Sequence, residues 1–66
     1  MAVARVTEIT ASSMSGFQDA FEEGINRASS TLRNITGAEI VSHKAKIENG
    51  KISEYRVTLK VTFILE

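Results

Sequence analysis

Few side chains in this sequence could perform chemistry. It has no cysteine, a single histidine at position 43 and a single aspartate at position 19. Without cysteine there is no thiol nucleophile, no disulfide and no thiolate metal site. Ser42 and His43 are neighbours in an expected strand, so their side chains point to opposite faces and cannot pair as nucleophile and base. We therefore expect a protein that is not an enzyme.

His43 itself is expected to be an ordinary residue on one face of a strand. In an assembly of identical chains, a single histidine could repeat around a symmetry axis and bind an ion there. That possibility is the lesser of the two.

Arg56 has the clearest capacity to bind a ligand. It lies in the segment SEYRVTLKVTFILE, where apolar and polar residues alternate, and it faces away from Tyr55. A guanidinium group can pair with a carboxylate or phosphate through two hydrogen bonds and can stack on a planar ring. The polar row of Arg56 is either plain surface or, if the chain forms a hollow assembly, the lining of a cavity or a subunit contact.

Charge and hydropathy exclude several classes of partner. Eight basic and eight acidic residues give a formal net charge of +0, so no excess of positive charge favours nucleic acid or an anionic membrane. No apolar run is long enough to span a bilayer, and the N-terminus does not resemble a signal peptide. We expect a cytoplasmic protein.

The elements that must position these residues follow from changes in periodicity. Strands are expected over Val3–Thr10, Ala38–Ile47 and the last segment, with a turn at Ala11–Ser13. The segment Glu48–Lys51 contains Asn-Gly, which favours a two-residue hairpin turn.

A helix is expected over Met14–Ile35. Its apolar residues recur every three or four positions, which places them on one stripe. The stripe consists of Phe17, Phe21, Ile25, Ala28, Leu32 and Ile35. Ser13 or Ser15 is the expected N-cap, with Ser15 and Gln18 forming a capping box, and Gly37 is the expected left-handed residue at the C-terminal end. Gly24 borders the stripe, where close approach by another backbone would explain it.

The fold class is therefore α+β, with the order β-α-β-β in a single domain over residues 1–66. We expect a three-stranded antiparallel sheet of order 1-3-2 against one long helix. One helix cannot cover three strands of this length, and a chain of 66 residues buries too little surface to be stable easily by itself. We expect other copies of the same chain to cover the rest of the sheet.

The sequence resembles the dodecins over nearly its whole length. The matching segments are VTEITASSMSGFQDA, INRASSTLRNITGAEIV and YRVTLKVTFILE. The resemblance implies a hollow homododecamer whose sheets wrap their helices. It also implies binding and storage of flavins such as riboflavin and FMN, without catalysis.

The resemblance also implies two flavin-binding positions, and both differ here. Gly37 stands where dodecins have a tryptophan that stacks on the flavin ring, and Arg56 stands where they have a glutamine that hydrogen-bonds the ring edge. We expect flavin binding to be weakened. The alternative is a dodecin-type shell without flavin, either structural or binding a divalent cation such as calcium, with Glu39 as the nearest carboxylate.

Overall fold

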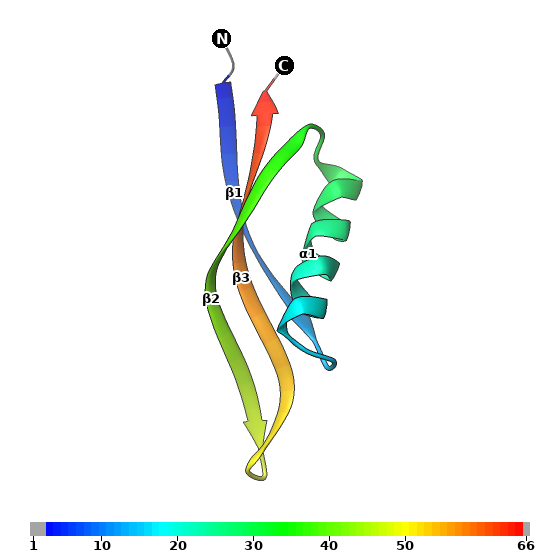
Figure 1. Ribbon diagram of the computed structural model, residues 1–66, viewed down its shortest axis with the longest axis vertical. Helices are drawn as coiled ribbons and strands as arrows, with labels where there is room; N and C mark the ends of the chain where they lie inside the picture. Colours follow the sequence, from blue (N-terminus) through cyan, green and yellow to red (C-terminus); the bar gives the residue numbers. More distant parts are fainter. Residues whose placement is uncertain (1–2, 66) are drawn as a thin grey trace.

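A computed structural model describes residues 3–65 of the chain (Figure 1). It consists of β1 (Val3–Ser13), α1 (Phe17–Thr31), β2 (Ile35–Glu48) and β3 (Lys51–Leu65). The strands form one antiparallel sheet in the order β1-β3-β2. The predicted fold class, element order and strand order are confirmed.

The central strand, β3, pairs differently with its two neighbours. Its pairing with β1 runs without interruption from Val3↔Leu65 to Ser13↔Tyr55. Its pairing with β2 is shifted at three places. The hairpin turn between β2 and β3 has positive φ angles at Asn49 (53°) and Gly50 (75°). These are the angles that the Asn-Gly sequence predicts for a type I′ turn.

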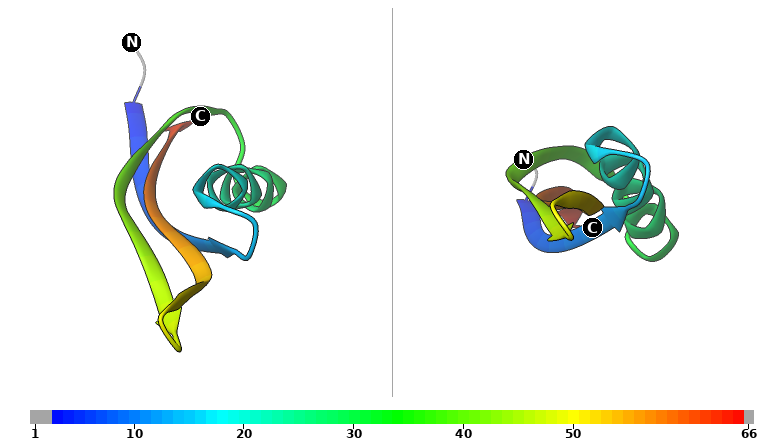
Figure 2. Two further views of the ribbon diagram at one scale, coloured as in Figure 1. Left: turned by 60° about the horizontal axis from the view of Figure 1, so that its bottom comes forward. Right: turned by 90° about the horizontal axis from the view of Figure 1, so that it is seen from below.

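The sheet curves around α1, which packs on one face of it (Figure 2). The buried core lies between them and consists of Ala20, Ala28, Val57, Leu59 and Val61. The apolar row of β3 therefore faces the helix. Alternate residues of the same strand, including Arg56, lie on the opposite face, which we call the outer face.

The helix begins later than the sequence predicted. β1 continues to Ser13, and Gly16 is the N-cap residue, without a side-chain capping hydrogen bond. The predicted caps are therefore wrong. The Ser13 hydroxyl instead accepts a hydrogen bond from the Ser15 N–H (2.9 Å) and donates one to Asp19. Ser13 thus organises the loop, and Asp19 lies in the first turn, where a negative charge favours the helix dipole.

The helix also ends earlier than predicted. It stops at Thr31, and the residue with a left-handed backbone is Asn34 (φ 61°). Ile35 and Gly37 both belong to β2, so the prediction that Gly37 ends the helix is wrong. Asparagine tolerates this backbone region better than most residues. The strand that follows it begins at Ile35, three residues earlier than the predicted Ala38.

Gly24 lies in α1 at a close contact with β1. A Cβ atom at Gly24 would lie 3.0 Å from the Cβ of Ala11 and 3.5 Å from a methyl group of Leu59. A close neighbour is present as expected, but its nearest atoms belong to strand side chains and not to another backbone.

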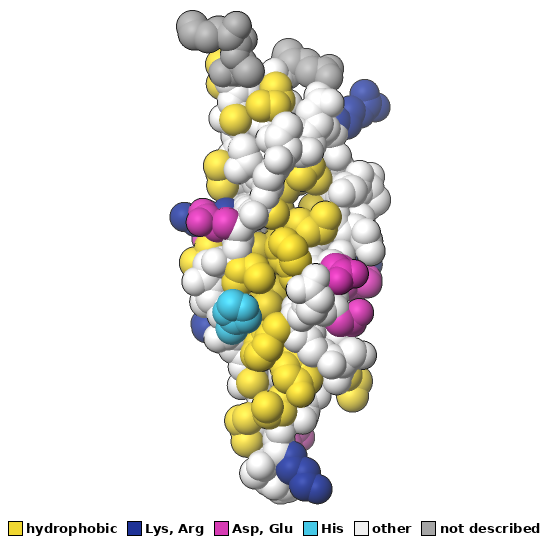
Figure 3. Space-filling model, viewed as in Figure 1, with side chains coloured by type: hydrophobic (Ala, Val, Ile, Leu, Met, Phe, Trp, Pro, Cys, Tyr) yellow, Lys and Arg dark blue, Asp and Glu magenta, His cyan; other side chains and the backbone are white. Residues whose placement is uncertain are grey.

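The molecule is long and leaves much apolar surface uncovered. It measures 51 × 19 × 13 Å, and its radius of gyration is 13.6 Å, against about 10.8 Å for a compact domain of this length. The β2–β3 hairpin extends past the start of α1, and an apolar surface runs between β2 and α1 down to that hairpin (Figure 3). Its exposed residues include Ile40, Ile47 and Ile52. Within residues 3–65, no helix is long and apolar enough to cross a membrane.

Candidate functional site

The outer face of the sheet carries the residues that the sequence singled out for binding. Cross-strand pairing arranges them in rows of three, one residue from each strand. From the hairpin toward the termini, the rows are Ser12–Arg56–Lys44, Thr10–Thr58–Ser42, Glu8–Lys60–Glu39 and Val6–Thr62–Gly37.

Arg56 is held by a carboxylate of its own strand. Its Nε lies 2.9 Å from Oε1 of Glu54, two residues away on the same face. A hydrogen bond to Arg56 lowers the pKa of the Glu54 carboxyl from its ordinary value, and the positive charge of Arg56 and a hydrogen bond from Ser12 add to this effect. Arg56 is therefore oriented in advance, with its remaining donors available to a ligand.

Positive charge exceeds negative charge around Arg56. Lys44 lies directly across from Arg56, and Lys46 lies across from Glu54. Lys46 makes a long ion pair of 3.8 Å with Glu48. Two like charges facing each other across a strand pair cost stability, so Lys44 and Arg56 together would favour an anionic group between them.

Gly37 leaves an open position near the other end of the outer face. It pairs with Thr62, and a Cβ atom placed on it would meet no atom within 4 Å. Thr62 is six residues from Arg56 along β3, which is about 20 Å. One chain therefore places Gly37 and Arg56 on the same face but does not bring them together.

Glu39 lies between these two positions. It pairs across the sheet with Lys60, and Glu8 pairs with Lys60 from the other side. Among residues 3–65, no three side chains of His, Cys, Asp or Glu gather as a metal site. A cation at Glu39 would need ligands from a second copy of the chain.

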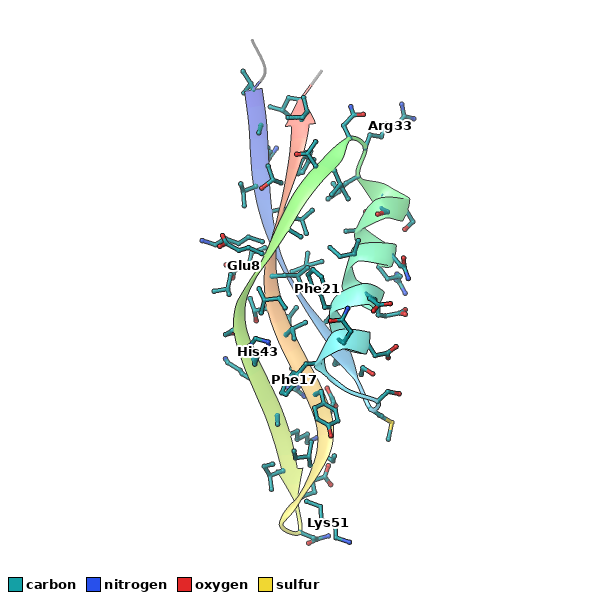
Figure 4. All side chains as sticks on the ribbon, viewed as in Figure 1. Glu8, Phe17, Phe21, Arg33, His43 and Lys51 are labelled. Carbon is teal, nitrogen blue, oxygen red and sulfur yellow. The ribbon has the colours of Figure 1, made fainter. Side chains whose placement is uncertain are left out.

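His43 lies on the helix-facing side of β2, away from these rows. Its ring meets Phe17 of α1 edge to face, with centroids 5.1 Å apart, and Phe17 meets Tyr55 in the same way (Figure 4). Such contacts stabilise by about 0.5–1.5 kcal/mol each. The structure gives His43 a packing contact on a strand face, as the sequence predicted.

Sequence reasoning missed Glu54, although a signal for it was present. Glu54 and Arg56 are two residues apart in a strand, so their side chains share a face and carry opposite charges. Thr62 and Val6 lie in the same cross-strand row as Gly37. Their place beside it could not be found without the register of the strands.

Comparison with known proteins accounts for this arrangement. The model of the Dodecin family matches residues 3–66. The chain belongs to the dodecin family. A comparison with curated proteins gave no match.

Solved dodecin structures agree closely with this fold. A dodecin from Streptomyces davaonensis is 40% identical, with a TM-score of 0.94, covering 98% of this chain and 96% of that one. A dodecin of Thermus thermophilus, solved as a single-residue variant, is 30% identical, with a TM-score of 0.95, covering 100% and 98%. A calcium dodecin from Mycobacterium tuberculosis, described as calcium chelating with a novel calcium-binding site, is 28% identical, with a TM-score of 0.84, covering 97% and 91%.

Proposed function

We propose that this dodecin assembles as a homododecamer and binds or stores a small planar anionic ligand of the flavin class, without catalysing a reaction. One observation carries the ligand proposal: a ring can lie against the outer face at Gly37, where no atom lies within 4 Å of a Cβ position. Arg56 reaches such a ligand only from another copy, because the two positions are about 20 Å apart in one chain. Binding therefore depends on assembly.

The exposed surface of the single chain supports the assembly. It amounts to 4882 Å², whereas a compact monomer of 7.2 kDa exposes about 4,100 Å². The excess of roughly 800 Å² equals what one partner contributes to a standard protein–protein interface.

The affinity for flavin is expected to be low. A tryptophan at position 37 would add a stacking contribution of about 0.5–1.5 kcal/mol beyond the area it buries. Glycine supplies neither contribution. Arg56 can compensate in part by pairing with a phosphate group, so FMN should bind more tightly than riboflavin.

Fluorescence titration tests the ligand proposal. Riboflavin and FMN are each titrated with the assembled protein, and quenching that saturates, with FMN the tighter ligand, is the expected result. No quenching of either flavin at high protein concentration would overturn flavin binding. Particle mass measured on the same sample tests the assembly separately.

Two substitutions test the position of the ligand. Gly37→Trp fits the open space and an unstrained strand backbone, and together with Arg56→Gln it should strengthen flavin binding by tenfold or more if the site is where we propose. Lys51→Trp, at the far end of the sheet, is the matched control and should leave flavin affinity unchanged. Equal affinities for Gly37→Trp and Lys51→Trp would count against the assignment of position 37.

A calcium-binding shell is the second candidate. Glu8 and Glu39 flank Lys60 on the outer face, and one relative is described as a calcium dodecin. Calorimetric titration with calcium tests it, with Glu39→Gln as the variant that should abolish the heat. A flat titration of the unmodified protein would remove this candidate.

A further inference from the structure

The β2–β3 hairpin ends in an Asn-Gly pair whose side-chain amide is free. Asn49 and Gly50 are both exposed, and they form the two-residue turn closed by the pair Glu48↔Lys51 (Figure 4, where Lys51 is labelled). Within residues 3–65, the Asn49 amide makes no hydrogen bond, and no atom lies within 4 Å of a Cβ position on Gly50. The Gly50 N–H donates to no backbone carbonyl in this part of the chain. Both groups are therefore open to reaction with each other and with water.

These two groups can form a covalent bond. The backbone nitrogen of Gly50 loses its proton to solvent base and attacks the side-chain carbonyl carbon of Asn49, and the amide nitrogen leaves as ammonia. The product is a five-membered succinimide ring, whose closure a glycine hinders least because it has no Cβ. Water then opens the ring at either carbonyl carbon, which leaves aspartate or isoaspartate at position 49. Asparagine counts among the thermolabile residues of proteins.

The folded turn holds the reacting atoms apart. Asn49 has a φ of 53° and Gly50 a φ of 75°, as in a type I′ turn, where ψ of the first residue is about 30°. In an L-residue this ψ places the next nitrogen about 150° away from Cβ, measured around the Cα–C bond. Ring closure requires that nitrogen and Cβ nearly eclipse each other. The turn must therefore open before Asn49 can react.

The tip of the hairpin, which we define as residues 47–52, can open separately from the rest of the sheet. The β2–β3 register is interrupted just before Ile47, so only the pairs Ile47↔Ile52 and Glu48↔Lys51 hold the tip beyond that irregularity. Ile47 and Ile52 are 57% and 50% exposed, and the hairpin extends past the start of α1 (Figure 1). A segment with so few buried apolar contacts opens at a lower free energy than the whole domain.

We infer that Asn49 is a site of spontaneous deamidation in the folded protein, and that local opening of the tip sets its rate. This inference is independent of the proposed ligand and of the proposed assembly. Either product adds a negative charge next to Glu48. Isoaspartate also lengthens the main chain by one carbon atom, so the tight turn cannot re-form with the same register.

Peptide mapping measures the reaction, because Lys46 and Lys51 bracket the site for tryptic cleavage. Native protein, protein unfolded in urea and a synthetic peptide of residues 44–55 are incubated in the same mildly alkaline buffer. We expect the peptide and the unfolded protein to convert at the same rate, and the native protein roughly ten- to a thousandfold more slowly. Asn26 and Asn34, which precede arginine and isoleucine, are internal references and should convert far more slowly than Asn49 in the unfolded chain.

A variant of the tip tests the opening. Ile52→Ala removes the cross-strand contact with Ile47, so conversion in the native protein should become about two- to fivefold faster, while conversion in urea stays the same. Val3→Ala, which truncates another exposed residue at the far end of β1, is the matched control and should leave both rates unchanged.

Three results would overturn the inference. Native protein that converts as fast as the peptide would show that the turn does not hold the reacting atoms apart. Native protein that does not convert while the peptide reacts to completion, or equal native rates in Ile52→Ala and Val3→Ala, would show that the tip does not open by itself. Unfolded protein that does not convert would exclude Asn49 as a site.

Discussion

At the scale of single residues, small side chains decide how closely the elements approach. Gly24 and Ala11 bring α1 against β1, and Gly37 leaves the outer face open. The first glycine is required by packing, and the second is not required by the backbone. This difference predicts opposite responses to substitution.

Gly24→Ala should destabilise the protein by about 1 kcal/mol. The new Cβ gains about 1 kcal/mol in helix propensity, but it lies 3.0 Å from a strand Cβ that cannot rotate away, and overpacking of this kind costs about 1–3 kcal/mol. Chemical denaturation at fixed chain concentration measures the difference. Gly24→Ala should cost less stability when it is made in the Ala11→Gly variant than when it is made in the parent, because the clashing Cβ of Ala11 is then absent. A Gly24→Ala variant more stable than the parent would contradict this prediction and would show that β1 shifts to make room for the new methyl group.

Glu54 should make the stability depend on acid pH. Its pKa in the folded protein is lowered, chiefly by the hydrogen bond to Arg56, so the unfolded chain binds its proton more readily. The stabilisation is present above the unfolded pKa of about 4.3 and is lost as pH falls through the lower, folded pKa. The melting temperature of Glu54→Gln should therefore differ from that of the parent more at pH 7 than at pH 3. A difference in melting temperature that is the same at both pH values would contradict this link between Glu54 and stability. High salt should reduce the difference at pH 7, since the Glu54–Arg56 pair is exposed.

At the scale of elements, backbone conformation fixed where the chain turns. Asn49 and Gly50 form the tight turn that sets the β2–β3 register. Asn34 has a left-handed backbone directly before β2 begins at Ile35. The geometry of the turn at Asn49 and Gly50 therefore affects the stability of the hairpin.

Gly50→Val should destabilise the protein by about 1–2 kcal/mol, because a β-branched residue is strained at a φ of 75°. Gly50→Asn is the matched control and should cost much less, since asparagine tolerates the left-handed region. The free energy of unfolding of each variant measures the effect. Equal losses in the two variants would show that the turn changes its type.

At the scale of the whole molecule, the chain has more sheet than one helix can cover. The long shape and the exposed apolar residues along β2 are the observations that support the proposed assembly. Folding and assembly should then be linked.

The melting temperature should rise with chain concentration, because association stabilises the folded form by mass action. Scanning calorimetry over a hundredfold range of concentration measures this shift. A melting temperature that stays constant while light scattering reports single chains of 7.2 kDa would contradict the linkage.

The sequence by itself determined the types of the elements, their order and the alternation of faces from Tyr55 to Leu65 in β3. Alternation along β3 and the three- to four-residue period of α1 arise from local geometry, so both are visible in the chain. The Asn-Gly turn was visible for the same reason. Only the tertiary structure decided where α1 ends. Asn34 accepts a backbone hydrogen bond from Ile64, and Ile35 pairs with Phe63, both in β3. The apolar period of the helix continues through Ile35 and does not reveal these contacts. It also decided that Gly37 and Arg56 share a face yet lie far apart, since the distance between them depends on the register of strands that are remote in sequence.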